Sequence, residues 1–203
     1  MSLIGKPLLA HSIEYAQQCN AIQAVFVSTD DEAIADVAKG YGAKVIMRNE
    51  TLSNDKAKSS DSLRHAVEEI ALLNVAFDAV VLLQTTSPFR PAELLDNCIN
   101  KFEESLCDSL FTVSTVKRKL GEIRNNMFYP LNYEFEQRSQ DLSACYFENG
   151  LVYIVKKEVI NQGLIFTPQA FPFVIDGWES TIDIDTLDDF EYASYLFHKH
   201  EKQ

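Results

Sequence analysis

The sequence predicts an α/β fold, in which a mostly parallel, Rossmann-like sheet is covered by helices on both faces. Two observations predict it. Short apolar runs alternate with segments of helical spacing along most of the 203 residues. One of these runs, Phe77–Leu83, is apolar at nearly every position, which is typical of a strand buried on both faces of a parallel sheet.

The first part of the chain alternates helices with short strands. Leu9 and Ile13 lie one helical turn apart, and so do Ile34 and Ala38. A short apolar run precedes Thr29 and predicts a buried strand. The expected elements are a helix over Lys6–Cys19, a strand over Ala24–Ser28, a helix over Asp31–Tyr41, a strand over Lys44–Met47, a polar loop over Asn49–Ser60 and a helix over Ser62–Leu73.

The second part continues the alternation around one irregular stretch. Residues Lys117–Ser143 are polar, with scattered aromatics and no clean period, which indicates a β-rich insertion. We expect one domain over residues 1–203, with 117–143 as this insertion. The other expected elements are strands over Phe77–Leu83, Ser109–Val116 and Gly150–Val155, helices over Pro91–Glu104, Lys157–Gln162 and Leu187–Phe197, and a strand edge over Ile182–Asp185.

Composition and charge exclude several classes of function. A net charge of −12 argues against a broad nucleic-acid surface, and it would repel an anionic ligand unless Arg, Lys or a metal ion intervenes. No apolar run is long enough to cross a membrane. The four cysteines are scattered without a Cys-x-x-Cys pair, which favours a reduced, cytoplasmic protein and argues against a zinc site.

A hydroxyl-rich turn, Gln84–Arg90, follows the Phe77–Leu83 run directly. Ligands of parallel α/β sheets bind just beyond the carboxyl ends of the strands. The turn therefore delivers Gln84, Thr85 and Arg90 to the place where a ligand would lie. In an alternative interpretation, Thr86 or Ser87 caps the following helix. Both interpretations can hold together.

A second acidic turn, Val27–Glu32, also follows a predicted strand. Asp30 or Asp31 could cap the helix that begins near Glu32, and acidic residues favour the first turn of a helix. Alternatively, one of these acids shapes a nucleotide pocket beside the loop.

A pair of carboxylates, Asp183 and Asp185, lies at alternate positions of a predicted strand edge. Alternate residues point to the same face, and Mg²⁺ prefers one or two carboxylates together with substrate phosphates. In the alternative interpretation, one Asp caps the last helix, in competition with Thr186, and the other is solvated. Asp188 and Asp189 look like acids of the first helical turn.

A basic cluster within the irregular stretch could receive an anionic substrate. For any single member, a solvated surface charge is the simpler interpretation. The cluster comprises Lys117, Arg118, Lys119, Arg124 and Arg138.

Taken in order, these motifs resemble the N-acylneuraminate cytidylyltransferase (CMP-sialic acid synthetase) family. The resemblance implies a nucleotidyltransferase fold with a dimerisation insertion at 117–143. It also implies CMP transfer from CTP to an acidic nine-carbon sugar with release of pyrophosphate, a step that supplies lipopolysaccharide or capsule synthesis. The matching pieces are Gly5–Leu8, Val27–Glu32, Leu82–Arg90, Glu148–Ile154 and Ile182–Thr186.

The same resemblance implies roles for individual residues and partners. The partners would be CTP, the acidic sugar and a second copy of the chain, without nucleic acid or membrane. Asp183 and Asp185 would hold Mg²⁺ or Mn²⁺ and act in catalysis. The expected nucleotide contacts are Arg48, Ser59 and Ser60, and the expected sugar contacts are Gln84, Thr85, Lys117 and Arg138.

The chain departs from the family pattern at three places. The glycine-rich basic loop that cradles the triphosphate, roughly PARxGSKxxxxKN, is absent from the sequence as written. We therefore expect slow turnover by these 203 residues, with cytidine binding retained. In a stretch that is typically RQDLP, Ser139 interrupts the Arg–Gln pair and Ser143 replaces the proline, and Thr85 replaces a proline elsewhere. Two alternatives follow: a non-catalytic dimeric relative that binds sugar or nucleotide, and a related nucleotidyltransferase that uses UTP.

Overall fold

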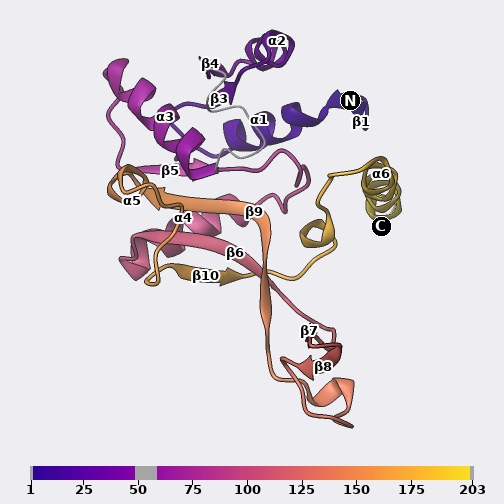
Figure 1. Cartoon of the computed structure of the whole chain (residues 1–203). Coiled ribbons are helices and arrows are strands. Elements are labelled where there is room, and N and C mark those ends of the chain that lie inside the picture. The colour runs from indigo at the N-terminus through magenta and orange to yellow at the C-terminus, as the bar shows by residue number, and fades with distance from the viewer. Residues whose placement is uncertain (1, 49–58, 202–203) are drawn as a thin grey trace.

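The computed structural model describes residues 2–48 and 59–201, and it shows an α/β protein (Figure 1). Its main sheet has the strand order β10–β6–β9–β5. Strand β10 is parallel to β6, whereas β9 is antiparallel to both β5 and β6. Three strands therefore share one direction and β9 runs against them, so that two of the three pairings in this sheet are antiparallel. The bounds are Ala79–Leu82 for β5, Ser109–Thr115 for β6, Tyr146–Lys156 for β9 and Phe171–Val174 for β10.

The first part of the chain contains a second, two-stranded parallel sheet, formed by β3 and β4. Helices α1 and α2 pack on this pair through Ile13, Val27 and Ala38. A short antiparallel pair, β1 and β2, precedes α1. The bounds are Ser2–Leu3 for β1, Lys6–Pro7 for β2, Leu8–Gln18 for α1, Phe26–Thr29 for β3, Glu32–Gly40 for α2 and Lys44–Met47 for β4.

Helices cover both faces of the main sheet. On β9, Tyr153 and Val155 pack with α3 and the short helix α5, whereas Val152 and Ile154 pack with α4. Because successive side chains of a strand point to opposite faces, α3 and α4 lie on opposite sides of the sheet. The bounds are Ser59–Leu72 for α3, Leu94–Ser105 for α4 and Lys157–Asn161 for α5. No helix in the described ranges is long and apolar enough to span a membrane.

Strand β5 is less buried than its sequence predicts. All of its residues are partly exposed, whereas Val152 and Val155 of β9 are fully buried. Among the strands that the structure describes, β5 pairs only with β9. The expectation of a strand buried on both faces is therefore wrong for β5, and β9, which has a strand on either side, is the more buried of the two.

The irregular stretch forms an arm, residues 117–143, that projects from the main sheet (Figure 1). Strands β6 and β9 extend beyond the main sheet and lead into the arm. The arm contains the antiparallel hairpin of β7 (Gly121–Arg124) and β8 (Met127–Pro130). The expected β-rich character is thus present. Phe128, Tyr129 and Phe135 are exposed, as expected, but Tyr133 is partly buried beneath Lys119.

Strand β10 was not expected from the sequence. It pairs in parallel with β6 at the edge of the sheet. Proline cannot donate a hydrogen bond to a ladder, so Pro172 argues against a central strand but is tolerated at an edge.

The turn after β5 does not cap helix α4. Helix α4 begins at Leu94 with Glu93 at its N-cap, well beyond Thr86 and Ser87. Proline disfavours helical backbone in the residue before it. Pro88 and Pro91 therefore keep this segment extended, and the capping interpretation is wrong.

Thr186 caps the last helix, α6 (Leu187–Glu201). Its Oγ1 accepts a hydrogen bond from the Asp189 backbone N–H at 3.2 Å, and the Asp189 carboxylate accepts one from the Thr186 N–H at 2.8 Å. This exchange is a capping box. Asp188 and Asp189 lie in the first helical turn, as expected, and neither Asp183 nor Asp185 caps the helix.

Loss of this cap should destabilise the protein. Thr186→Ala removes the hydroxyl that accepts from Asp189, and we expect a loss of about 1 kcal/mol of unfolding free energy. Thr186→Ser keeps the hydroxyl and is the matched control. Urea unfolding of the variants would measure the difference, and an Ala variant as stable as the Ser variant would contradict the assignment.

Candidate active site

The loop after β5 is exposed in its first half and buried in its second half. The Gln84 and Thr85 side chains are exposed, whereas Ser87, Phe89 and Arg90 are buried. Phe89 stacks on Phe197 of α6 with ring centroids 5.1 Å apart. The loop is therefore anchored at its far end and presents Gln84 and Thr85 to solvent at the end of the strand.

The two candidate metal ligands lie beside this loop. The Ile184 N–H donates a hydrogen bond to the Thr86 carbonyl at 2.8 Å. Ile182 and Ile184 are buried while Asp183 and Asp185 are exposed, so both carboxylates project from the same side of an extended segment. This segment follows a 3₁₀ turn and is not a strand, which corrects the expected strand edge. The alternation of side chains nevertheless holds, because it requires only extended backbone.

Gly150 of β9 allows the Gln84 side chain to approach the sheet. It has φ +74°, and a Cβ added there would lie 2.3 Å from Gln84 Oε1 and 3.0 Å from Ser87 Oγ. Only glycine tolerates both this backbone and this contact. The pairing register of β6 and β9 shifts between Phe111 and Val113. The Gln84 amide therefore packs directly on the backbone of an irregular part of β9.

A buried polar network holds this part of β9. Thr112 Oγ1 donates to Asn149 Oδ1 at 2.6 Å, and Asn149 Nδ2 donates to Ser114 Oγ at 2.8 Å. Ser114 Oγ in turn donates to the Ile175 carbonyl at 2.6 Å. All three side chains are nearly inaccessible to solvent. Satisfied buried networks of this kind specify a unique geometry, so the backbone beside Gln84 is rigid.

A phenol and a carboxylate of β9 are joined by a hydrogen bond. The Tyr153 hydroxyl donates to Glu148 Oε2 at 3.2 Å. Burial raises the pKa of Tyr153 well above its usual value, and the negative charges of Glu148 and Asp183 raise it further. The phenol therefore stays protonated at neutral pH and remains a hydrogen-bond donor.

Glu148 also lines a cavity of about 600 Å³ between β6, β9 and β10. Its wall is mostly apolar, with this carboxylate as the charged group. The lining residues are Phe111, Val113, Tyr146, Phe147, Glu148, Pro172 and Val174. Ligand pockets typically combine apolar walls with few polar groups.

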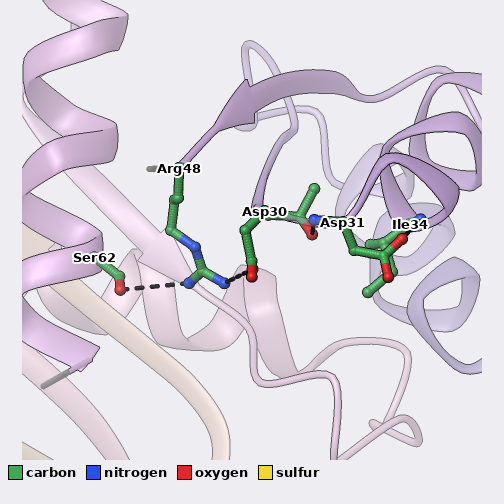
Figure 2. Close-up of polar contacts among 6 residues, drawn as sticks. Asp30, Asp31, Ile34, Arg48 and Ser62 are labelled. Carbon is green, nitrogen blue, oxygen red and sulfur yellow. Dashed lines mark hydrogen bonds and ion pairs between the residues drawn. The ribbon is translucent and has the colours of Figure 1, made fainter. Parts of the chain in front are cut away.

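Arg48 follows β4 and connects two elements (Figure 2). Its Nη2 donates to Asp30 Oδ1 at 3.0 Å, and its Nη1 donates to Ser62 Oγ at 3.4 Å. Ser59 and Ser60 begin α3, one turn before Ser62. The described contact of Arg48 with α3 is thus made through Ser62. The rest of the expected polar loop, Asn49–Lys58, lies outside the described residues.

The two acids after β3 have separate tasks. Asp31 caps α2, since its Oδ1 accepts from the Ile34 N–H at 3.0 Å. Asp30 instead forms an ion pair with Arg48 (Figure 2). The capping interpretation of this turn is therefore confirmed for Asp31. The interpretation that one of these acids shapes a nucleotide pocket stays a prediction.

The two remaining sugar candidates lie on the arm. Lys117 is exposed, and Arg138 forms an ion pair with Asp141 at 2.7 Å. Figure 1 shows the arm well separated from the loop after β5 of the same chain. The structure therefore brings the segment of Asp183 and Asp185 against the loop of Gln84 and Thr85, and it shows no hydrogen bond or ion pair that joins Lys117 or Arg138 to these four described residues.

The donor set around the Asp pair suits a hard cation that shares its coordination with a substrate. Within residues 2–48 and 59–201, no group of three or more His, Cys, Asp or Glu is placed to hold a metal ion alone. Two exposed carboxylates leave positions open for phosphate oxygens and water, as Mg²⁺ requires. The residues present therefore fit Mg²⁺ or Mn²⁺ bound together with a nucleotide.

Sequence reasoning missed the contributions of Ser62, Glu148 and Gly150. A signal existed for Gly150, because an isolated glycine at the edge of a predicted strand can mark a bulge or a close backbone approach. No local pattern marks Ser62 or Glu148, since their importance comes from neighbours distant in the sequence.

Comparison with known proteins agrees with this geometry. The cytidylyltransferase family model matches residues 1–202. A pseudaminic acid cytidylyltransferase of Campylobacter jejuni is 32% identical over 204 residues, which cover 97% of this chain and 88% of that protein. An N-acylneuraminate cytidylyltransferase of Escherichia coli O18:K1:H7 is 31% identical over 211 residues, which cover 100% of this chain and 49% of that protein.

A solved structure shares the fold. A CMP:2-keto-3-deoxy-manno-octonic acid synthetase complexed with CTP aligns with a TM-score of 0.69 at 17% identity, covering 98% of this chain and 91% of that chain. The nucleotidyltransferase fold expected from the motifs is thereby confirmed. The chain therefore belongs to the cytidylyltransferase family and is a nucleotidyltransferase related to the CMP-sialic acid synthetases.

Proposed function

We propose that this protein transfers CMP from CTP to an acidic nine-carbon sugar and releases pyrophosphate. The observation that carries the proposal is the 2.8 Å hydrogen bond from Ile184 N to the Thr86 carbonyl. It sets the carboxylates of Asp183 and Asp185 beside the loop that presents Gln84. The named relatives, which act on pseudaminic acid and N-acylneuraminate, support the class of sugar.

The reaction needs little covalent chemistry from side chains. The anomeric hydroxyl of the sugar attacks the α-phosphorus of CTP and loses its proton to water, while a new phosphorus–oxygen bond forms and the bond to pyrophosphate breaks. Asp183 and Asp185 would hold Mg²⁺ or Mn²⁺, which neutralises phosphate charge and aligns the phosphates when bound. The exposed Gln84 and Thr85 would orient the sugar, so that positioning lowers most of the barrier.

The base would be bound at the end of β4. Arg48, Ser59 and Ser60 are the proposed cytosine contacts, and Asp30 and Ser62 hold the Arg48 guanidinium in place. Cytosine offers an exocyclic amine and a carbonyl, so it needs both an acceptor and a donor. A carboxylate, a guanidinium and hydroxyls at one place supply both.

A pyrophosphate-release assay with each nucleoside triphosphate and a panel of acidic sugars tests the proposal. The panel should contain N-acylneuraminic, legionaminic and pseudaminic acids. We expect release only with CTP, Mg²⁺ and at least one of these sugars. Release with UTP instead would identify a different sugar nucleotidyltransferase, and cytidine binding without release would identify a binding protein.

We further propose that the active protein is a homodimer formed through the arm. Ile123, Met127 and Phe135 on the arm are each more than 60% exposed, which leaves an apolar surface on a monomer. In such a dimer, Lys117 or Arg138 would reach the sugar site of the partner subunit. The arm of one subunit would thus supply cations to the loop after β5 of the other subunit.

Light scattering at tens of micromolar should therefore give the mass of a dimer. Ile123→Asp places a charge on the arm, at a side chain that is 76% exposed, and should yield monomers. Leu72→Asp changes a side chain that is 74% exposed at the end of α3 and should leave the dimer intact. A monomeric mass for the wild-type protein would contradict the dimer proposal.

A further inference from the structure

Arg90 is a buried cation whose hydrogen-bond acceptors are all neutral. Only 9% of the residue is accessible to solvent. Its Nε donates to the Leu151 carbonyl at 2.7 Å, its Nη1 to Ser12 Oγ at 3.1 Å, and its Nη2 to the Gln84 carbonyl at 2.8 Å. The guanidinium also lies over the ring of Tyr15, 5.6 Å from its centroid.

Burial of such a group is costly without strong compensation. Burial lowers the pKa of Arg90 to about 10, so the side chain remains charged at neutral pH. The planar guanidinium offers donors in a rigid fork, which suits simultaneous bonds to several elements. Lysine, a point charge on a flexible stem, cannot reproduce this geometry.

The bonds of Arg90 join the parts of the chain that meet at Gln84. One bond holds the Gln84 backbone itself. Another holds Leu151, the residue after Gly150, against which the Gln84 amide packs. The guanidinium therefore sets the distance between the loop after β5 and β9, and with it the direction of the Gln84 side chain.

We propose that Arg90 is a positioning residue for sugar recognition, which acts by aiming the Gln84 amide from the β5 loop across Gly150. This inference rests on the proposed function. Arg90 is only 9% accessible to solvent and its three hydrogen-bond acceptors are all protein groups, so we expect it to act without contacting the sugar. Its effect must therefore pass through Gln84, and it must appear in sugar binding rather than in cytidine binding.

A double-mutant cycle tests this route. Calorimetry would measure the affinities for CMP and for CMP-N-acetylneuraminate or CMP-pseudaminate, whichever the wild type binds more tightly. Gln84→Ala should reduce the affinity ratio of CMP-sugar to CMP by about three- to tenfold. Arg90→Lys should reduce it similarly, and Arg90→Lys added to Gln84→Ala should reduce it no further.

The matched control is Ser12→Ala, which removes the bond toward α1 but leaves those to Gln84 and Leu151, and should leave the ratio unchanged. If Arg90→Lys does not melt cooperatively, Tyr15→Leu, which removes the ring beneath the guanidinium, replaces it in the cycle.

Independent, additive effects of the substitutions at Arg90 and Gln84 would overturn the inference. A wild type that binds no CMP-sugar more tightly than CMP would instead contradict the proposed function.

Discussion

Replacing Asp185 with Asn is expected to lower Mg²⁺-dependent turnover by about 100-fold or more, because a bound metal ion contributes several kcal/mol of transition-state stabilisation. Asn keeps the shape of the side chain but loses the negative charge that attracts the cation. Asp183→Asn should have a similar effect, since both carboxylates project from the same side of one extended segment. Initial rates over a Mg²⁺ titration would measure the loss.

Asp188→Asn is the matched control for this experiment. Asp188 is also exposed and lies in the first turn of α6, only three positions beyond Asp185. It should turn over at the wild-type rate, and all three variants should melt as the wild type does. If Asp183→Asn and Asp185→Asn both retain wild-type rates at every Mg²⁺ concentration, the metal assignment is wrong.

Gly150→Ala should damage both stability and sugar recognition. Its φ of +74° is unfavourable for alanine, at a cost of about 1–2 kcal/mol. The new methyl group would also lie 2.3 Å from Gln84 Oε1 and must displace that side chain. We expect the KM for the sugar to rise about tenfold, the loss of a good hydrogen bond, while the KM for CTP changes little.

Gly163→Ala separates the cost of the strained backbone from the effect of the contact with Gln84. Gly163 has nearly the same backbone, with φ +77°, but its nearest neighbour is Arg64 Nη1 at 4.0 Å. This variant should lose stability through its backbone alone and keep the wild-type KM for the sugar. An equal KM in the two glycine variants would show that contact between Gly150 and Gln84 does not matter for recognition.

Elements dominated by local physics were predicted well from the sequence. Strand β4 has the expected bounds, Lys44–Met47. Asp31 caps α2, one of the two aspartates considered for that role, because an N-cap depends on a hydrogen bond three residues along the chain. Asp183 and Asp185 share a side because alternation needs only extended backbone.

Features that depend on residues far apart in the sequence could not be predicted from local patterns. The sequence could not show that β9 would run antiparallel between β5 and β6, or that β10 would join the edge. It could not show that Arg48 would meet Ser62, because that contact depends on how α3 lies against β4. The burial of β5 was overestimated because apolar composition does not reveal how many strands pair with it.

In the candidate site too, local sequence patterns were predictable and contacts between distant segments were not. The motifs identified Gln84, Thr85, Asp183 and Asp185 through their positions after strands and their spacing. The geometry that joins them depends on backbone groups, such as the Thr86 carbonyl and the Gly150 backbone, which carry no pattern in the sequence. The role of Arg90 is hidden for the same reason, since two of its three acceptors are main-chain carbonyls.

The most direct test of the account is a crystal structure of the protein with Mn²⁺ and a CMP-sugar, in which anomalous scattering locates the metal. We predict a manganese peak between the carboxylates of Asp183 and Asp185, with the sugar against Gln84 and the cytosine beside Arg48. A manganese peak distant from both carboxylates, or a sugar bound away from the loop after β5, would contradict the central claim that this loop and the Asp pair form one catalytic site.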